Sequence, residues 1–519
     1  MRTIGGIPAR LNRLARWQSG SMRILGAVET VLGLLLTAMA VATAASGGDA
    51  SVFLIPAPFL LVPGILQYTL FAGGRDISVA VSILTVMTAW SIAFAAMAAP
   101  FLLHGCTWYD ALFESVSGLT TTGFSVFADV ESLPAALLFW RSLSQWVGGL
   151  AVVIVFMFLL PMLGIGGRAL INNELSGAEA GNFAAKLREV AVNFIAIYLA
   201  LSAIQMLLLA ILGVPVFEAV CIGMSCISTG GMSVLNDSLA SHTFAVQAVV
   251  VVFMFLGGTN FYLHYRFLYK RDYKAYIRCQ ELVWTVIWFA VATVLILLAL
   301  ASAGGGGLGD DLWSSLFAVV SFGTSTGFSA HDHSVWPAAT LPVLMLLGLF
   351  GAMSGSTAGG IKIYRLVIVK EYIAYGLHRM IHPRAVRDVR LDGHSVGTDA
   401  LIAALTVMLS FLAAAAVGTV LFMWTEPGTG LADAAGLCIA SLGNVGAGIG
   451  VLGDGVPVAD LSLPTKAVMA ALMWIGRLEV TMFLLLFTRV FWSDVRRHAA
   501  ASHRRPGRRT AAVIPGRRR

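Results

Sequence analysis

Long apolar stretches alternate with short polar segments along almost the whole chain. Ten of these stretches reach the roughly 20 residues that a helix needs to cross a bilayer. They lie near residues 24–45, 52–72, 78–101, 138–165, 190–212, 244–264, 281–302, 338–366, 400–424 and 465–490. The pattern therefore predicts an all-α polytopic membrane protein, because helices satisfy their own backbone hydrogen bonds in lipid.

Four further apolar stretches are too short to span a bilayer. They lie near residues 110–120, 215–227, 312–322 and 431–441, each between two of the long stretches. Backbone that enters the membrane without crossing it is tolerated only where protein or a water-filled cavity shields it. We therefore expect four re-entrant half-helices.

The composition agrees with a membrane protein and excludes a soluble domain. Of the 519 residues, 58% are hydrophobic and 12% are charged, whereas charged residues make up about a quarter of a soluble domain. The five cysteines lack the spacing of a metal site or a disulfide framework. The basic N-terminus and the sequence ATAASG at 42–47 imitate a secretory signal peptide. The apolar run 24–45 is too long for one, so we expect an uncleaved first helix.

The positive charges fall on one side of the predicted membrane. With the N-terminus in the cytoplasm, Lys and Arg lie in the inner loops and in the arginine-rich tail. The outward segments 46–51, 102–137, 213–243, 303–337 and 425–464 contain neither. This positive-inside pattern predicts that both termini are cytoplasmic, and it explains the net charge of +7 without nucleic acid. The same outward segments are rich in carboxylates, which either concentrate cations at a pore or are ordinary solvated loop acids.

A polar motif with a central glycine follows each of the four short apolar stretches. It reads GLTTTGFS at 118–125, ISTGGMS at 227–233, GTSTGFS at 323–329 and, most divergent, GNVGAG at 443–448. Alignment puts Gly123, Gly231, Gly327 and Gly446 in one column, about 100 residues apart. A unit of span, half-helix, polar loop and span that recurs four times predicts four pore-forming repeats.

Acidic or capping residues flank the motif. Thirteen residues before the column glycine stand Asp110, Glu218, Ser314 and Asp433, which suit the start of a short helix. That helix would point its negative dipole end at the loop, which favours a cation there. Five to eight residues after the glycine stand Asp129, Asp237, Asp332 and Asp454, which we expect at the outer mouth of the pore.

The composition of the loops suits coordination of a bare cation. Carbonyl oxygens replace the hydration shell of an ion where the backbone adopts dihedrals that glycine permits, and hydroxyl groups either brace such a loop or add ligands. A single Gly–Thr cluster is more often a turn or a close helix contact, but four in register favour a selectivity filter. The predicted filter comprises Thr121, Thr122, Gly123, Thr229, Gly230, Gly231, Ser325, Thr326, Gly327, Asn444, Val445 and Gly446.

These motifs resemble those of the TrkH/KtrB family of bacterial potassium-uptake subunits. The resemblance extends to FWRSLSQWVGG at 139–149, LPMLGIGG at 160–167, GGTNFYLHYRFL at 257–268, MSGSTAGGIK at 353–362 and WIGRLEV at 474–480. Two additional helices before the first repeat favour the TrkH branch. The resemblance implies a homodimer in the bacterial inner membrane that is not an enzyme and needs no cofactor. It also implies that the filter residues bind K⁺ and that a TrkA-type cytosolic nucleotide-binding subunit is the partner.

One predicted span is interrupted by polar residues. Residues 338–376 are too many for one span, and SGSTAGG at 354–360 suggests a broken helix that lines a cavity. Arg477 lies about halfway along the last predicted span, where a charge is costly and usually functional. The resemblance implies a gate beneath the filter, made of Gly355, Ser356, Thr357, Ala358, Gly359 and Arg477.

Other polar residues near the spans have less specific expected roles. Glu479 is expected to bond to a neighbouring helix, and Lys362 to mark the inner end of its span. Asn260 and His264 match the family pattern, with either a capping and packing role or one in permeation. The basic segment 364–392 is expected to dock the partner subunit or anionic lipid.

These features divide the chain into six expected parts. Residues 1–76 form a basic segment with a two-helix extension, and residues 496–519 form a basic tail. Between them lie four pore repeats at 77–189, 190–279, 280–397 and 398–495, the third of which contains the gating loop.

The sequence leaves alternatives open. Gly230 and Ala447 depart from the TTGFS pattern, which is compatible with a sodium-permeable or weakly selective transporter. No decisive carboxylate relay lies within the membrane, which favours channel-like flow over coupling to protons or sodium. A polytopic membrane enzyme would have only His331, Asp332 and His333 as candidates. GGGGLG at 304–309 matches the nucleotide-binding pattern G-x-G-x-x-G, but no strand precedes it in the sequence, so a nucleotide site is not expected there.

Overall fold

The protein is almost entirely helical. The structure is a computed structural model and describes residues 19–71, 78–163, 180–304, 307–383, 389–448 and 458–503. In this part of the chain the strands are β1 (Arg390–Leu391) and β2 (His394–Ser395), which pair antiparallel with Leu391 opposite His394. The all-α class predicted from the sequence is therefore confirmed.

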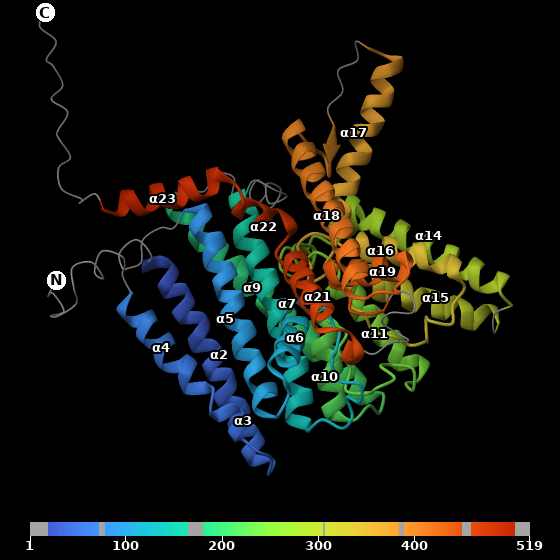
Figure 1. Cartoon of the computed structure of the whole chain (residues 1–519). Helices are drawn as coiled ribbons and strands as arrows, with labels where there is room; N and C mark the ends of the chain where they lie inside the picture. The colour runs from blue at the N-terminus through green and yellow to red at the C-terminus, as the bar shows by residue number, and fades with distance from the viewer. Residues whose placement is uncertain are drawn as a thin grey trace, which may run out of the picture. The chain divides into compact units, whose positions relative to one another are not determined.

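The helices follow the predicted apolar stretches closely (Figure 1). The N-terminal helices are α2 (Ser19–Ala45), α3 (Ser51–Leu54), α4 (Ala57–Leu70) and α5 (Val79–Leu103). The middle of the chain forms α6 (Trp108–Leu119), α7 (Ala135–Leu163), α9 (Ala180–Ile211), α10 (Val216–Ile227), α11 (Phe244–Gly257), α12 (Phe261–Leu268), α13 (Ala275–Arg278) and α14 (Gln280–Ser302). The remainder forms α15 (Leu308–Gly323), η1 (Ala338–Thr340), α16 (Leu341–Leu349), α17 (Ile363–Ile381), α18 (Thr398–Thr425), α19 (Leu431–Leu442), η2 (Val458–Asp460), α21 (Leu463–Arg477), α22 (Val480–Leu486) and α23 (Arg489–His503).

The chain divides into two compact units. The described residues of the first are 19–38, 55–71, 78–93 and 484–503. In this unit α2 and α4 pack closely through small residues, since a Cβ on Gly26 would lie 2.7 Å from Tyr68 N. Gln67 donates a hydrogen bond to Glu29 (3.1 Å), which satisfies a carboxylate within the helix pair.

The second unit, residues 39–54 and 94–483, contains four segments of similar construction. In each, a long helix leads into a short helix, a polar loop and a further helix. The short helices are α6, α10, α15 and α19, and the helices that follow the loops are α7, α11, α16 and α21. Each following helix packs on its own short helix and on that of the next segment, and α21 packs on α6. The four segments therefore close into a ring.

Three predicted spans are sharply bent or interrupted by polar residues. Residues 244–264 and 465–490 were predicted as continuous, and this is wrong, because α11 and α12 meet at 96° and α21 and α22 at 101°. At the first break Asn260 caps α12 by accepting a hydrogen bond from Tyr262 N (2.9 Å). At the second, Glu479 has a φ of 66° and forms an ion pair with Arg365 of α17 (2.6 Å). The predicted interruption of residues 338–376 is confirmed, since α16 ends at Leu349 and α17 begins at Ile363.

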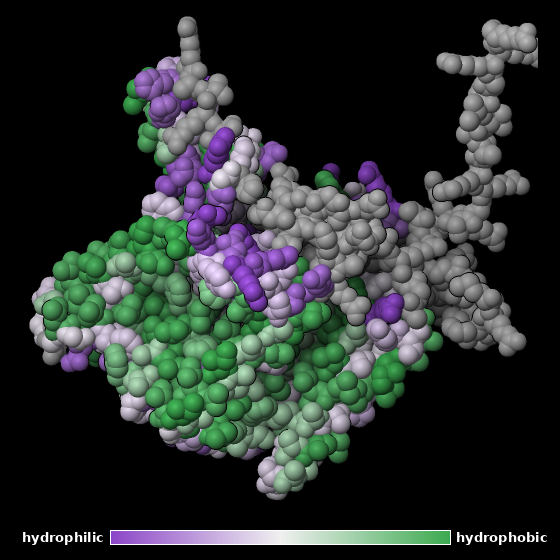
Figure 2. Space-filling view, turned by 180° about the vertical axis from the view of Figure 1, so that it is seen from behind, coloured by the Kyte–Doolittle hydropathy of each residue, from purple (hydrophilic) through white to green (hydrophobic). Residues whose placement is uncertain are grey.

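The protein crosses the membrane several times. Among the described residues, seven helices are long and apolar enough to span, or nine if each bent pair counts as one. Figure 2 shows hydrophobic residues over much of one face. In the second unit, α14 and α18 carry large apolar side chains that are exposed, including Val286, Val294, Leu298, Ile402, Leu409 and Val420. Lipid is the environment in which such surfaces are stable.

Glycines bring the long and short helices into close contact. In three segments, a glycine of the helix after the loop meets the carbonyl oxygen of the last residue of the short helix. The pairs are Gly148 with Leu119, Gly257 with Ile227 and Gly476 with Leu442. A side chain at any of these glycines would push the two helices apart.

Replacing Gly148 by alanine is expected to destabilise the protein, because the new methyl group would collide with Leu119 O. Overpacking of this kind costs about 1–3 kcal/mol, and thermal unfolding in detergent should show a lower melting temperature. The matched control is Gly376→Ala on α17, where a Cβ meets no atom within 4 Å. An unchanged melting temperature for Gly148→Ala would contradict the close approach of α6 and α7.

Candidate functional site

The four polar loops leave their short helices in the same geometry. Each short helix ends four residues before the aligned glycine, at Leu119, Ile227, Gly323 and Leu442. In each loop, the N–H just before the glycine donates to the carbonyl five residues earlier. These hydrogen bonds run from Thr122 to Ser117 (2.9 Å), from Gly230 to Ser225 (2.8 Å), from Thr326 to Ser321 (2.8 Å) and from Val445 to Ala440 (2.9 Å).

Each loop holds two residues in the left-handed region of backbone conformation. The first stands two residues before the glycine: φ is 50° at Thr121, 53° at Thr229, 52° at Ser325 and 54° at Asn444. The second is the glycine itself: φ is 104° at Gly123, 73° at Gly231, 83° at Gly327 and 74° at Gly446. A residue with a side chain adopts such a conformation at a cost of about 1–3 kcal/mol, so the surroundings must hold the backbone in place.

The glycines join the loops into a ring. In every case the position of a glycine Cβ would collide with a carbonyl oxygen of the next loop. The colliding pairs are Gly123 with Gly230, Gly231 with Thr326, Gly327 with Val445, and Gly446 with Thr122. The fourth loop thus touches the first, and none of the four positions has room for a side chain.

Side-chain hydroxyl groups and one amide form hydrogen bonds around the loops. The hydroxyl groups of Thr120 and Thr122 lie 2.7 Å apart, and those of Thr324 and Thr326 repeat this distance. In the divergent fourth loop, Asn444 donates from Nδ2 to the Thr122 hydroxyl (2.9 Å). The predicted filter residues are therefore brought together, and all of them except the column glycines Gly123, Gly231, Gly327 and Gly446 are buried.

The interrupted segment between α16 and α17 lies against the same loops. Thr357 Oγ1 lies 3.1 Å from Ile227 O and 3.2 Å from Thr229 Oγ1. Gly359 N donates to the Ser325 hydroxyl (2.6 Å). The other predicted gate residues bond locally or to α12: Phe261 N donates to Gly355 O (3.0 Å), Ser356 to Met353 O (2.6 Å), and Ala358 N to Ser356 Oγ (3.3 Å).

Arg477 reaches the middle of this segment. It is 3% exposed, and its Nη1 donates to Thr357 O at 2.7 Å. Its Nε and Nη2 have no hydrogen-bond partner among the described residues. The sequence placed Arg477 within a continuous helix, whereas it is the last residue of α21, which allows its guanidinium to meet the interrupted segment.

Three expectations for neighbouring residues can be compared with the structure. Glu479 bonds to a neighbouring helix, as predicted, through Arg365. His264 has a packing role, with ring nitrogens 2.6 Å from Tyr276 Oη and 3.0 Å from Leu256 O. Lys362, predicted at the inner end of a span, directly precedes α17, and its buried side chain turns back and donates to the Ala358 carbonyl.

The predicted helix-start residues are correct in three segments. Asp110, Glu218 and Asp433 each lie in the first turn of their short helix. Ser314 does not, because α15 begins at Leu308 with two acidic residues, Asp310 and Asp311, in its first turn. Asp110 also forms an ion pair with Lys466 of α21 (2.9 Å), which ties the first segment to the fourth.

Of the acidic residues predicted at the outer mouth, Asp129, Asp237 and Asp332 are exposed and accept hydrogen bonds from the loops around them. Asp129 accepts a hydrogen bond from Asn236 (2.9 Å) and Asp237 from Ser241 N (3.0 Å). Ser334 donates to Asp332 through its hydroxyl (2.6 Å) and its N–H (2.9 Å), which holds the pKa of that carboxyl below its usual value. Asp454 lies outside the described residues.

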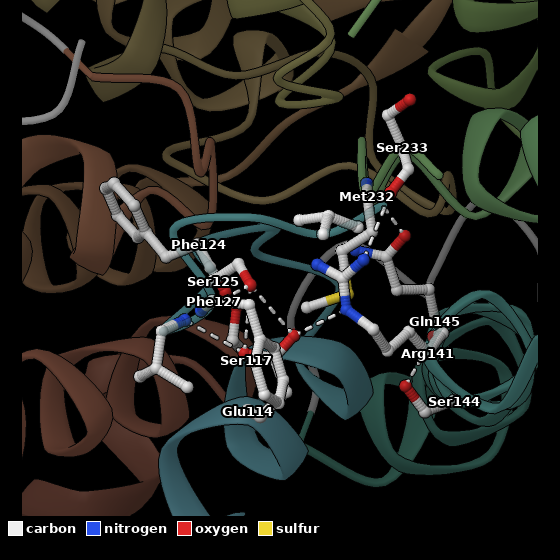
Figure 3. A network of polar contacts seen from close by, with 12 residues as sticks. Glu114, Ser117, Phe124, Ser125, Phe127, Arg141, Ser144, Gln145, Met232 and Ser233 are labelled. Atoms are coloured by element: carbon white, nitrogen blue, oxygen red, sulfur yellow. Dashed lines mark hydrogen bonds and ion pairs between the residues drawn. The ribbon is translucent and has the colours of Figure 1, made fainter. Parts of the chain in front are cut away.

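Sequence reasoning missed the contacts of several buried polar residues beside the ring, of which Glu114, Arg141 and Gln145 are drawn in Figure 3. Glu114 of α6 pairs with Arg141 of α7 (2.7 Å), and Gln145 of α7 reaches the second loop. Glu281 of α14 accepts from Ser354 N (2.6 Å) and Tyr364 N (3.2 Å), at the two ends of the interrupted segment. The available signal was the polarity of these residues within or beside apolar stretches, since such groups seldom lie in lipid without a partner.

Two of the residues considered for an enzyme site, Asp332 and His333, have structural roles. His333 is buried and packs against the rings of Phe322 and Trp336, with ring centroids 5.4 Å and 4.6 Å away. Asp332 accepts both hydrogen bonds of Ser334, as described above.

Comparison with known proteins agrees with this architecture. The TrkH family profile, described as a cation transport protein, matches residues 76–496. The "Trk system potassium uptake protein TrkH" of Salmonella typhimurium is 32% identical over 79% of this chain and 86% of its own. The Escherichia coli protein TrkG, with the same system name, is 30% identical over 84% and 90%.

A solved structure extends the comparison to three dimensions. The crystal structure of "the Potassium Transporter TrkH from Vibrio parahaemolyticus" superimposes with a TM-score of 0.81 at 26% identity. The match covers 91% of this chain and 99% of the other. The chain is therefore a transport protein and not a membrane enzyme, and it belongs to the TrkH family of cation transport proteins.

Proposed function

We propose that this protein takes up potassium, and that the ring of four loops is its selectivity filter. The observation that carries the proposal is the closed series of contacts between the column glycines and the carbonyls of the next loop. In each loop a residue outside the left-handed region separates two residues inside it, and such alternation turns successive carbonyls to one side of the chain. Carbonyls directed in this way replace the hydration shell of K⁺. The names of the relatives support potassium as the transported ion.

The short helices add a favourable electrostatic field. Each of the helices α6, α10, α15 and α19 ends four residues before the column glycine of its loop. The C-terminal end of a helix carries a partial negative charge, so four such ends favour a cation at the centre of the ring. The outer acids Asp129, Asp237, Asp332 and Asp454 would raise the local concentration of cations at its entrance.

Residues 355–359 and Arg477 would act as the gate beneath this filter. Thr357 and Gly359 bond to Thr229 and Ser325, which are filter residues, and Arg477 bonds to the backbone of Thr357. Nε and Nη2 of Arg477 are buried without a partner among the described residues, and a buried charge of this kind usually has a functional role, which a gate would supply. A fixed positive charge at that position opposes the passage of cations.

The topology and assembly belong to the same proposal. Four pore repeats, at 77–189, 190–279, 280–397 and 398–495, would follow the two-helix extension in the bacterial inner membrane, with both termini in the cytoplasm. The system name of the relatives is consistent with additional subunits. A TrkA-type nucleotide-binding subunit would dock at the cytoplasmic face of a homodimer, and K⁺ would be cargo without any cofactor.

Uptake of radioactive rubidium into proteoliposomes that contain only this chain tests the proposed function. We expect potassium to compete for uptake at least about tenfold more effectively than sodium, which corresponds to about 1.4 kcal/mol. Equal competition by the two ions would contradict a potassium-selective filter and would favour a weakly selective cation transporter.

Replacing Gly123 or Gly327 by serine is expected to lower the preference for potassium over sodium. The new Cβ would displace the carbonyl of Gly230 or Val445, and it would strain a residue at positive φ. Gly213→Ser is the matched control, because Gly213 also has a positive φ (90°) but no atom within 4 Å of its Cβ position. Competition ratios equal to wild type in both filter variants would refute the filter assignment.

Replacing Arg477 by alanine is expected to raise rubidium flux several-fold, because it removes a buried charge and its bond to Thr357 O. Deletion of residues 355–359 is expected to act in the same direction. Arg496→Ala, at an exposed position of α23, serves as the control and should leave flux unchanged. Wild-type flux in both the deletion and Arg477→Ala would remove these residues from the gate.

A further inference from the structure

The second loop of the ring lacks the internal brace of the first and third. In those loops the residue before the glycine is Thr122 or Thr326, and its hydroxyl bonds to the hydroxyl of Thr120 or Thr324. The corresponding residue of the second loop is Gly230, which has no side chain with which to make this contact. From the sequence alone, this missing contact predicts that the second loop is held less rigidly than the first and third.

Gln145 of α7 fills the space that a side chain at Gly230 would occupy. A Cβ built on Gly230 would lie 2.6 Å from Gln145 Oε1 and 2.7 Å from its Nε2. Nε2 donates to Gly230 O at 2.6 Å, and Oε1 accepts from Met232 N at 3.1 Å. The carboxamide therefore bonds to the backbone on both sides of Gly231, from the preceding segment of the ring.

A buried ion pair fixes the adjoining turn of α7. Arg141, one turn before Gln145, pairs with Glu114 (2.7 Å), and both side chains are 3% exposed or less. Arg141 Nη1 donates to Ser233 O (3.0 Å), two residues beyond Gly231. Figure 3 shows both α7 side chains extending toward the second loop, with Glu114 on the short helix α6.

The carboxylate of Glu114 is also held by the first loop. It accepts from Val126 N at 3.0 Å and from the Ser125 hydroxyl at 3.2 Å. A fully buried carboxylate is stable only when it is paired and hydrogen-bonded, and removal of either partner is costly. Glu114 and Arg141 therefore couple the position of the first loop to that of the second through α7.

We propose that Gln145, supported by the Glu114–Arg141 pair, is a positioning residue for the second filter loop and determines the preference for potassium over sodium. The carboxamide replaces the missing threonine of this loop with a brace from the neighbouring helix. Selectivity depends on where the carbonyls of the ring stand, so loss of the brace would let the Gly230 carbonyl move and accommodate the smaller ion. This inference rests on the proposed function of the ring.

The test is a double-mutant cycle between Gln145 and Gly230, with rubidium uptake and potassium–sodium competition as the measurement. Gln145→Ala removes both hydrogen bonds and should lower the preference for potassium at least about fivefold. Gly230→Thr alone should lower it as well, because the threonine would collide with the Gln145 carboxamide. The double variant has room for the threonine and gives the sequence Ser-Thr-Thr-Gly, in which the Ser228 hydroxyl stands where the third loop has Thr324. It should therefore recover part of the preference.

Gln247→Ala is the matched control for loss of a buried glutamine. Gln247 of α11 is 6% exposed, donates to Leu239 O (3.0 Å) and accepts from Trp313 Nε1 (2.8 Å), but it does not bond to a filter residue. The Gln247→Ala variant should have lower thermal stability than the wild type but the same potassium–sodium competition ratio. If Gln145→Ala does not fold, Gln145→Glu keeps the acceptor for Met232 N, loses the donor to Gly230 O and is interpreted in the same way.

The outcomes separate this inference from the function on which it rests. A selective wild type with a less selective Gln145 variant, and partial recovery in the double variant, supports the inference. A selective wild type whose Gln145 variants are equally selective overturns the inference alone. A wild type that accepts potassium and sodium equally overturns the proposed function and the inference with it.

Discussion

The structure depends on one constraint of the backbone: four loops must each hold two residues at positive φ while their glycines touch the next loop. Neither condition is stable in an isolated loop, because left-handed conformations are costly for Thr121, Thr229, Ser325 and Asn444. The short helices fix where each loop begins, and the ring closes only when all four loops are in place. Glycines in the long helices serve the same end, since they let α7, α11 and α21 approach the ends of their short helices.

The four segments share this backbone geometry but stabilise it with different side chains. The first and third loops use threonine hydroxyls, the fourth uses Asn444, and the second uses Gln145 from another helix. The buried Glu114–Arg141 pair contacts the first loop through Val126 N and the second loop through Ser233 O. Symmetry of the backbone is thus maintained by an asymmetric set of braces, so substitutions at equivalent positions should not have equal effects.

Much of the fold and of the candidate site could be predicted from local sequence signals. Apolar length indicated the spans, the aligned glycines indicated the ring, and the polar run 354–360 indicated the interrupted helix. The breaks after Gly257 and at Glu479 were missed because contacts with distant residues produce them, such as the pair of Glu479 with Arg365. The contacts of Lys362 and Gln145 were missed for the same reason, since their partners are backbone N–H and carbonyl groups that have no sequence signature.

The central claim is that the ring binds a dehydrated monovalent cation through its backbone carbonyls. Crystals of the protein grown with thallium or rubidium in place of potassium would test it through anomalous scattering. The account predicts density enclosed by the four loops, next to the carbonyls of the residues that precede the column glycines, and loss of that density when sodium alone is present. Density that is absent from the ring, or equally strong with sodium, would contradict it.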